Sequence, residues 1–163
     1  MGRVRGSVPA EQLLEAWGVN NRVNLMLLDA ISPAGLKSTL STRGGRDVAR
    51  QFAHMHNVRV QWLEVSARDL AAGLTKFDTD DSPAAGVLKK SFTASGDAIG
   101  ELIARSVADS GKVKSYKRSV ATMLGYFIAH EGHHRGSILL TLKQTGNKVP
   151  SEVQWGIWEW DKI

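Results

Sequence analysis

Residues 126–136 read YFIAHEGHHRG and contain three of the five histidines of the chain. His130 and His134 are four residues apart, so a helix would place both imidazoles on one face, about one turn apart. The apolar residues Phe127 and Ile138 fall on the same stripe, so this face points towards the core or a cleft. Two neutral imidazoles at this spacing can bind one metal ion, and two core histidines bonded to the backbone are the alternative.

The same residues also match the pattern H-E-x-x-H, in which Glu131 would be the general base of a zinc protease. The longer forms of this motif are not met. One form needs a histidine ten residues after the first, where this chain has Leu140. Another needs a carboxylate on a second helix, but Glu152 and Glu159 lie in a tryptophan-rich tail. A zincin-like metalloprotease is therefore kept as an alternative.

The composition is that of a folded protein. The 163 residues are enough for a single domain over residues 1–163 with a proper core. Hydrophobic residues make up 42% and charged residues 23%, which are ordinary globular values. The sequence has no cysteine, which excludes disulfides and thiolate ligands and favours a cytoplasmic location. No apolar run approaches the ~20 residues of a membrane span, so we expect no membrane partner.

The formal net charge of +5 raises the question of a nucleic-acid partner. The basic residues are scattered along the chain. The densest group is Lys112, Lys114, Lys117 and Arg118, which we expect to form a solvated surface. No specific nucleic-acid binding is therefore predicted.

Apolar residues recur at helical spacing in four long segments, which predicts an all-α four-helix bundle. The predicted helices cover residues 9–31, 47–71 and 83–108, and a fourth helix starts at Ser115 or Ser119 and ends near Gln144. Asp47 is the predicted cap of the second helix, and Asp81 or Ser82 of the third. Residues 34–46 are predicted as a loop, and residues 112–114 as a locally extended stretch.

Two polar stretches have more than one interpretation. Residues 20–24 read NNRVN in the middle of the first helix, as either an exposed face or amide groups near a cleft. Residues 42–46 read TRGGR, and a basic glycine-rich loop of this kind can bind an anion. The loop lacks the spacing of a P-loop, so a plain connector is expected.

The C-terminal tail, residues 149–163, is rich in tryptophan. Trp155, Trp158 and Trp160 lie within six residues. Burying one large apolar side chain is worth roughly 1.5–3 kcal/mol, so leaving all three in water would be costly. We expect the tail to dock on the bundle or at a subunit interface, with these side chains largely buried.

The second helix offers a third histidine for the pair on the fourth. His54 and His56 are two residues apart and cannot share a face, so at most one can join the pair. His54 is preferred because it lies between Phe52 and Met55, beside the apolar stripe. His56 is the weaker candidate and is expected to be exposed. Three histidines would leave coordination positions open for water or substrate, as catalytic metal sites do.

Two motifs together resemble the DinB/YfiT-like superfamily. Residues 52–55 (FAHM), followed by Arg59 and Trp62, are similar to its apolar-x-His-apolar motif on the second helix. Residues 130–137 (HEGHHRGS) are similar to its H-x-x-x-H-R-G-Q motif on the last helix. Ser137 stands where the family motif has glutamine, so any role of that glutamine does not carry over.

The resemblance implies a four-helix bundle of the DinB/YfiT-like type that frequently forms homodimers. It implies one divalent metal ion, zinc or nickel, with iron or manganese as alternatives, and His54, His130 and His134 as its ligands. Characterised relatives include metal-dependent thiol S-transferases and a thiol-dependent isomerase. The implied function is a metal-dependent transferase or hydrolase for a small molecule, such as a thiol. A non-catalytic, stress-induced protein that binds metal or nucleic acid is a further alternative.

Four other residues are candidates for roles beside the metal ion or the substrate. Glu131 leaves the helix about 100° away from His130, which fits a position near the ligands better than direct binding. His133 lies on the flank of the histidine face, as a proton shuttle or an exposed polar residue. Arg135 could anchor an anionic substrate or pair with an acid on a neighbouring helix. His56 is the fourth candidate.

Overall fold

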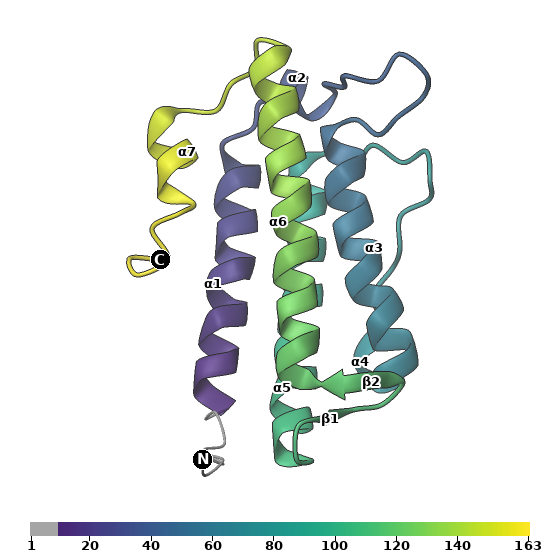
Figure 1. Cartoon of the computed structure of the whole chain (residues 1–163). Coiled ribbons are helices and arrows are strands. Elements are labelled where there is room, and N and C mark those ends of the chain that lie inside the picture. The colour runs from purple at the N-terminus through teal and green to yellow at the C-terminus, as the bar shows by residue number, and fades with distance from the viewer. Residues whose placement is uncertain (1–9) are drawn as a thin grey trace.

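The computed structural model describes residues 10–163, in which four long helices lie side by side (Figure 1). These helices are α1 (Ala10–Asp29), α3 (Val48–Ser66), α5 (Ala85–Ala108) and α6 (Val120–Gln144). Helix α5 packs against α1 and α3, and α6 packs against the same two helices. The mostly helical fold that the sequence predicts is therefore confirmed.

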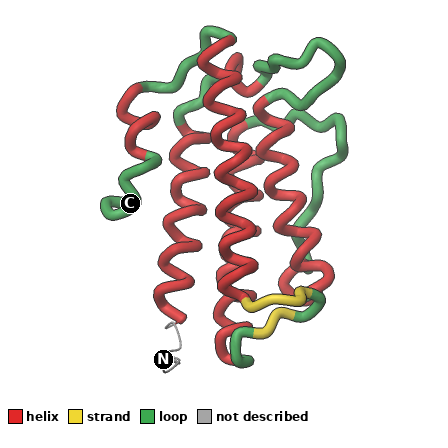
Figure 2. The backbone as a smooth tube through the Cα atoms, in the orientation of Figure 1, coloured by secondary structure: helices red, strands yellow, loops and turns green. Residues whose placement is uncertain are grey.

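Short elements connect or follow the long helices (Figure 2). They are the helices α2 (Pro33–Leu36), α4 (Arg68–Ala71) and α7 (Ser151–Gly156), and the antiparallel strands β1 (Lys112–Val113) and β2 (Tyr116–Ser119). The extended stretch predicted at residues 112–114 is thus the first half of a hairpin. None of the helices in residues 10–163 is long and apolar enough to cross a bilayer.

Capping side chains explain where two of the long helices begin. Asp47 accepts a hydrogen bond from the backbone amide of Arg50 at 2.8 Å, and α3 starts at the next residue, as predicted. Ser119 accepts a hydrogen bond from the backbone amide of Thr122, which selects Ser119 over Ser115 as the start of α6. The predicted start of the first helix, residue 9, lies outside the described residues.

Two predicted boundaries around the second helix are wrong. The predicted helix 47–71 is interrupted at Ala67, whose φ of −153° separates α3 from α4. The first residues of the predicted loop 34–46 are helical, because α2 extends to Leu36. This short helix forms because Ser32 accepts a hydrogen bond from the backbone amide of Gly35 at 3.0 Å.

The predicted cap of the third helix is also wrong. Helix α5 follows Ala84, which makes no side-chain capping bond. Asp81 instead accepts a hydrogen bond from the backbone amide of Asp78 at 2.8 Å, within the preceding loop. The hydroxyl of Ser82 donates to Asp47 at 2.7 Å, so it joins this loop to the start of α3.

The core contains two apolar clusters, and the charged side chain of Arg59 lies between aromatic rings of the two. One cluster includes Phe52 and Phe92, whose ring centroids are 5.7 Å apart, and the other includes Trp17 and Phe127, at 5.6 Å. The guanidinium of Arg59 lies 4.7 Å from the ring centroid of Trp17 and 4.5 Å from that of Phe92. A charged group at this depth needs a partner of opposite charge.

The tail docks through fewer side chains than the sequence predicts. Ile157 is buried and Trp160 is half-buried, and α7 packs against α1. A side-chain nitrogen of Arg22 in α1 donates to the carbonyl oxygen of Ile163 at 3.1 Å. In the single chain, however, Trp155 and Trp158 are 68% and 74% exposed, so their burial against the bundle is not found.

Candidate metal centre

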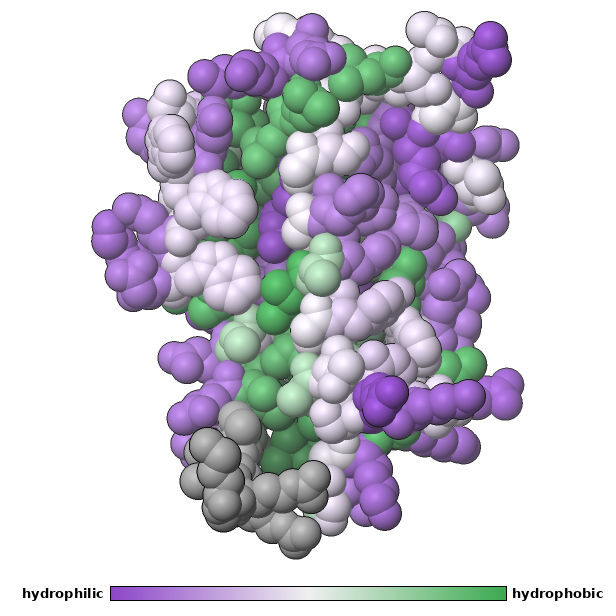
Figure 3. Space-filling model, in the orientation of Figure 1, coloured by the Kyte–Doolittle hydropathy of each residue, from purple (hydrophilic) through white to green (hydrophobic). Residues whose placement is uncertain are grey.

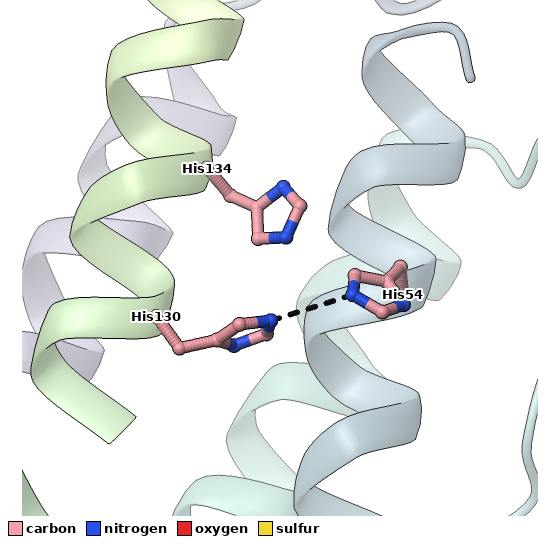
Figure 4. Close-up of side chains that lie close together, drawn as sticks. All are labelled: His54, His130 and His134. Carbon is pink, nitrogen blue, oxygen red and sulfur yellow. Dashed lines mark hydrogen bonds between the residues drawn. The ribbon is translucent and has the colours of Figure 1, made fainter. Parts of the chain in front are cut away.

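Three histidines from two helices, α3 and α6, point toward one another (Figure 4). His54 comes from α3, while His130 and His134 come from successive turns of α6. One ring nitrogen from each lies within 4.8 Å of the other two, and the Nε2 atoms of His54 and His130 are 3.3 Å apart. Two ligands bound tetrahedrally at ~2.0–2.1 Å lie about 3.3–3.4 Å apart, so this spacing suits one metal ion.

The three imidazoles are neutral at physiological pH. Burial, the charge of Arg46 and the neighbouring His130 lower the pKa of His54 from 6.5 to about 4. Burial and the other histidines, His130 first among them, lower the pKa of His134 from 6.5 to about 4. Burial also lowers the pKa of His130. Metal ligands must be unprotonated, and these pKa shifts leave the three imidazoles in the unprotonated form.

Gln51 lies beside the cluster, and the sequence interpretation missed it. Its side-chain oxygen is 3.5 Å from Nδ1 of His134, a long contact in which the ring N–H donates. A proton held at Nδ1 leaves the lone pair of Nε2 free for a metal ion. Gln51 precedes His54 by three residues on α3, and this helical spacing is the signal that could have identified it.

The ring of His130 is oriented by packing. It stacks on Tyr126 with ring centroids 6.0 Å apart and an interplanar angle of 13°. Its Nδ1 atom is buried and has no hydrogen-bond partner among the described residues. Nε2 is therefore the nitrogen of this ring that contacts a polar group, the imidazole of His54.

The two remaining histidines do not belong to the cluster. His56 is buried, which corrects the expectation that it is exposed. Its Nδ1 is 3.1 Å from the hydroxyl of Ser95, and its Nε2 is 3.0 Å from the carbonyl oxygen of Thr75. His133 is exposed on the flank of α6, with its ring centroid 5.3 Å from that of His134.

Glu131 points into the core and is the partner of Arg59. Its Oε1 accepts from Nε of Arg59 at 2.7 Å, and its Oε2 accepts from Nη2 of the same guanidinium at 2.9 Å. Oε2 also accepts from the side-chain amides of Asn20 at 2.7 Å and Asn24 at 2.6 Å. Burial raises the pKa of the Glu131 carboxyl, but Arg59 and the amides outweigh this and hold it below its usual range.

Two sequence interpretations change as a result. Asn20 and Asn24 are fully buried and bonded to charged groups, so the exposed-face interpretation is wrong for both. The Glu131 carboxylate is occupied by four donors and shielded from water, so it cannot take a proton as a general base. The zincin-like alternative thus lacks its base. Its carboxylate ligand is also lacking, since among residues 10–163 only the three histidines form a possible metal cluster.

Arg135, also on α6, bonds to the two asparagines that hold Glu131, and together with Arg59 these residues form a buried polar cluster. One of its nitrogens, Nη1, donates to the side-chain oxygens of Asn20 at 2.9 Å and Asn24 at 2.8 Å. Of the two alternatives for Arg135, pairing with an acid on a neighbouring helix is not found, because Arg135 forms no salt bridge within the part of the chain that the structure describes. Burial lowers the pKa of its guanidinium.

A polar cavity of about 190 Å³ adjoins the histidine cluster at His54. Its lining carries charges of both signs, from two arginines and two aspartates, and amide groups. These residues are Arg46, Arg50, Asp78, Asp81, Asn57 and Gln61. Arg46 belongs to the glycine-rich loop that the sequence predicts to be a plain connector. The loop therefore brings a cation close enough to lower the pKa values of His54 and His134.

The comparisons with known proteins add one finding. Residues 6–154 match the model of the DinB family. The searches of curated proteins and of solved structures found no match to the chain. The family model covers almost the whole chain, including all three clustered histidines and the polar cluster beneath them.

Proposed function

Because the chain belongs to the DinB family, we propose that it is a metal-dependent enzyme with one divalent ion bound by His54, His130 and His134. The observation that carries the proposal is the convergence of three ring nitrogens within 4.8 Å. Their neutral state and the buried amide of Gln51 beside His134 support it. The four long helices are then the bundle of the DinB/YfiT-like type.

The donor set favours zinc or nickel, with iron or manganese as alternatives. Imidazole nitrogen suits all of these ions, and no thiolate is present in the sequence to select among them. Three protein ligands are the number found in catalytic zinc sites, where structural sites use four. A bound ion of this kind lowers the pKa of a bound water towards ~7 or binds a thiolate, which supports hydrolase or thiol S-transferase chemistry.

The substrate in this proposal is a small molecule with a negatively charged part. The cavity beside His54 is small, and its lining contains Arg46 and Arg50 together with Asp78 and Asp81. Arg50 already donates to Thr79 and Asp80, whereas the guanidinium of Arg46 has no partner within residues 10–163. A guanidinium binds a carboxylate through two parallel hydrogen bonds, so Arg46 would orient an anionic group next to the ion. The substrate could be a thiol that carries a carboxylate. His133, exposed beside His134, is in place to move a proton between the site and water.

We also propose a homodimer as the working form. Large apolar side chains that the single chain leaves in contact with water support this, among them Trp155 at 68% and Leu140 at 51% exposed. Light scattering behind a sizing column measures the mass directly. A mass of one chain at micromolar concentration would contradict the dimer without affecting the metal site.

The metal proposal is tested by counting ions per chain in protein purified without a nickel column. We expect about one divalent ion in the parent after loading and dialysis against a weak chelator. Alanine at position 54, 130 or 134 leaves two imidazoles and should empty the site under the same conditions. His133→Ala is the matched control, since it removes an exposed histidine next to His134. A parent that binds none of zinc, nickel, iron or manganese would refute the proposal.

Catalysis needs a separate assay. The metal-loaded protein is tested for transfer of small carboxylated thiols to electrophiles and for hydrolysis of small esters and amides. Turnover that is lost in the His54→Ala variant and kept in the Glu101→Gln variant, which changes an exposed side chain of α5, would support an enzyme. One tightly bound ion without turnover in any of these assays would favour the non-catalytic alternative.

A further inference from the structure

A second concave site lies on the opposite side of α6 from the histidines. It is a groove of about 470 Å³ between α6 and the C-terminal tail, which we term the tail groove. Its apolar walls are formed by Ile128, Leu139, Ile157, Trp158 and Trp160. Figure 3 shows hydrophobic surface running along this face between α6 and the tail at the left. The volume is in the range of small-molecule sites, roughly 300–1,000 Å³.

The tail groove has one charged group in its lining, the guanidinium of Arg135. The side chain is mostly covered, since the residue is only 9% exposed. Its Nη1 atom is used by Asn20 and Asn24, but Nε and Nη2 donate to no group within residues 10–163. Neither of these atoms is among the fully buried unpaired ones. Their N–H groups are therefore open to the groove.

The charges of the buried cluster do not balance. It contains two guanidiniums, Arg59 and Arg135, and one carboxylate, Glu131. Both oxygens of Glu131 accept hydrogen bonds from Arg59, in a bidentate pair at 2.7 and 2.9 Å. Arg135 reaches this carboxylate only through the two asparagines. One positive charge is thus left over at the base of an apolar groove, where an anion would stabilise it.

We propose that the tail groove binds a small carboxylate with an apolar aryl or alkyl body. The carboxylate accepts hydrogen bonds from Nε and Nη2 of Arg135, the paired geometry in which guanidinium and carboxylate fit best. The body lies against Trp158, Trp160 and Ile157 and replaces water on their surfaces. A single cation matches a singly charged carboxylate better than a doubly charged phosphate.

The test is a titration followed by tryptophan fluorescence and calorimetry, with 4-phenylbutyrate and octanoate as probes. Both should bind the intact chain, with a change in tryptophan emission from the groove walls. The neutral amide of 4-phenylbutyrate should bind about 10-fold or more weakly, the loss of one charge-assisted hydrogen bond. Equal binding of acid and amide would overturn the role of Arg135, and no binding of either acid would overturn the site.

A glycine on α6 provides a variant that fills the groove without unfolding the helix. Gly136 lines the groove, and a Cβ atom added there meets nothing within 4 Å. Gly136→Leu should therefore fold and should bind both acids about 10-fold or more weakly, because the leucine side chain occupies the apolar surface that the acids would cover. Gly125→Leu is the matched control: it lies on the same helix with nothing within 4 Å of its added Cβ, outside the groove. Equal affinity in both variants would refute the location.

Two further measurements distinguish binding in the tail groove from binding at the histidine cluster and from a subunit interface. The acids should bind the His54→Ala variant as tightly as the parent, because that variant changes only the metal centre. Loss of binding in His54→Ala would mean that the acids bind at the histidine cluster. If a second copy of the chain covers the groove instead, Gly136→Leu should halve the mass in light scattering and the acids should not bind. Either of these two results would overturn the proposal.

Discussion

Replacing Glu131 by glutamine tests whether this side chain stabilises the core or acts at the metal centre. The side chains of Arg59 and Glu131 are 0% and 1% exposed, and their closest atoms are 2.7 Å apart. Glutamine keeps the shape of the side chain but removes its charge and turns one acceptor into a donor. The Arg59 guanidinium is then left in the core without its counter-charge.

The magnitude follows from the burial of both partners. Removing one member of a buried ion pair costs about 3–5 kcal/mol, because the other charge remains desolvated. The glutamine amide would place its nitrogen at the Oε1 position, where only Nε of Arg59 donates, since three donors meet at Oε2. Even there two donors face each other. For a chain of this length the loss corresponds to a melting temperature lower by roughly 6–20 °C.

The chain offers a matched control on its surface. Glu101 pairs with Arg105 through the same atoms, Nε to Oε1, at 2.8 Å, but these side chains are 52% and 48% exposed. Water and salt screen such a pair, and its removal is usually close to neutral. Glu101→Gln should therefore leave the unfolding midpoint unchanged within error.

The assay is urea unfolding followed by circular dichroism, in a chelator so that metal binding does not contribute. A Glu131→Gln midpoint equal to that of Glu101→Gln would refute the reasoning. If Glu131→Gln had this unchanged midpoint, kept its metal and lost metal-dependent activity, that result would support Glu131 as a general base. A double variant with methionine at positions 59 and 131 should recover part of the loss, because it removes the desolvated charge of Arg59 together with its partner.

Three other outcomes are expected. Without metal, the free energy of unfolding should fall as the pH drops from about 6.5 to about 4. In this range the two histidines bind protons in the unfolded chain but not in the folded one, where the pKa of His54 and of His134 is about 4. Thermal melts at several pH values in a chelator measure this. Ile157→Ala should cost about 2–5 kcal/mol in urea unfolding, whereas Trp158→Ala, at a 74% exposed position, should cost little. Duplex DNA should bind no better than roughly 10⁻⁴–10⁻⁶ M at physiological salt in a shift assay.

Local spacing predicted the features that depend on one helix at a time. The shared face of His130 and His134 follows from their four-residue separation, and the start of α3 follows from Asp47. The sequence narrows the start of α6 to Ser115 or Ser119, and the structure selects Ser119. The break at Ala67 has no such signal, because alanine is a good helix former, yet its φ of −153° ends α3. The exposed positions of Trp155 and Trp158 likewise depend on which face of a short tail meets α1.

The polar core shows what a pairwise interpretation of the same sequence could have found. Arg59 lies on the apolar stripe of the second helix, and an arginine on a buried face needs an acid. Residues 120–144 contain a single acid, Glu131, which also lies on a largely apolar helix. A buried arginine and a buried acid of this kind indicate a pair, and the structure shows Arg59 bonded to Glu131. Their pairing removes Glu131 from the H-E-x-x-H interpretation, because a carboxylate that neutralises Arg59 in the core cannot also act as a base at the metal ion on another face of α6.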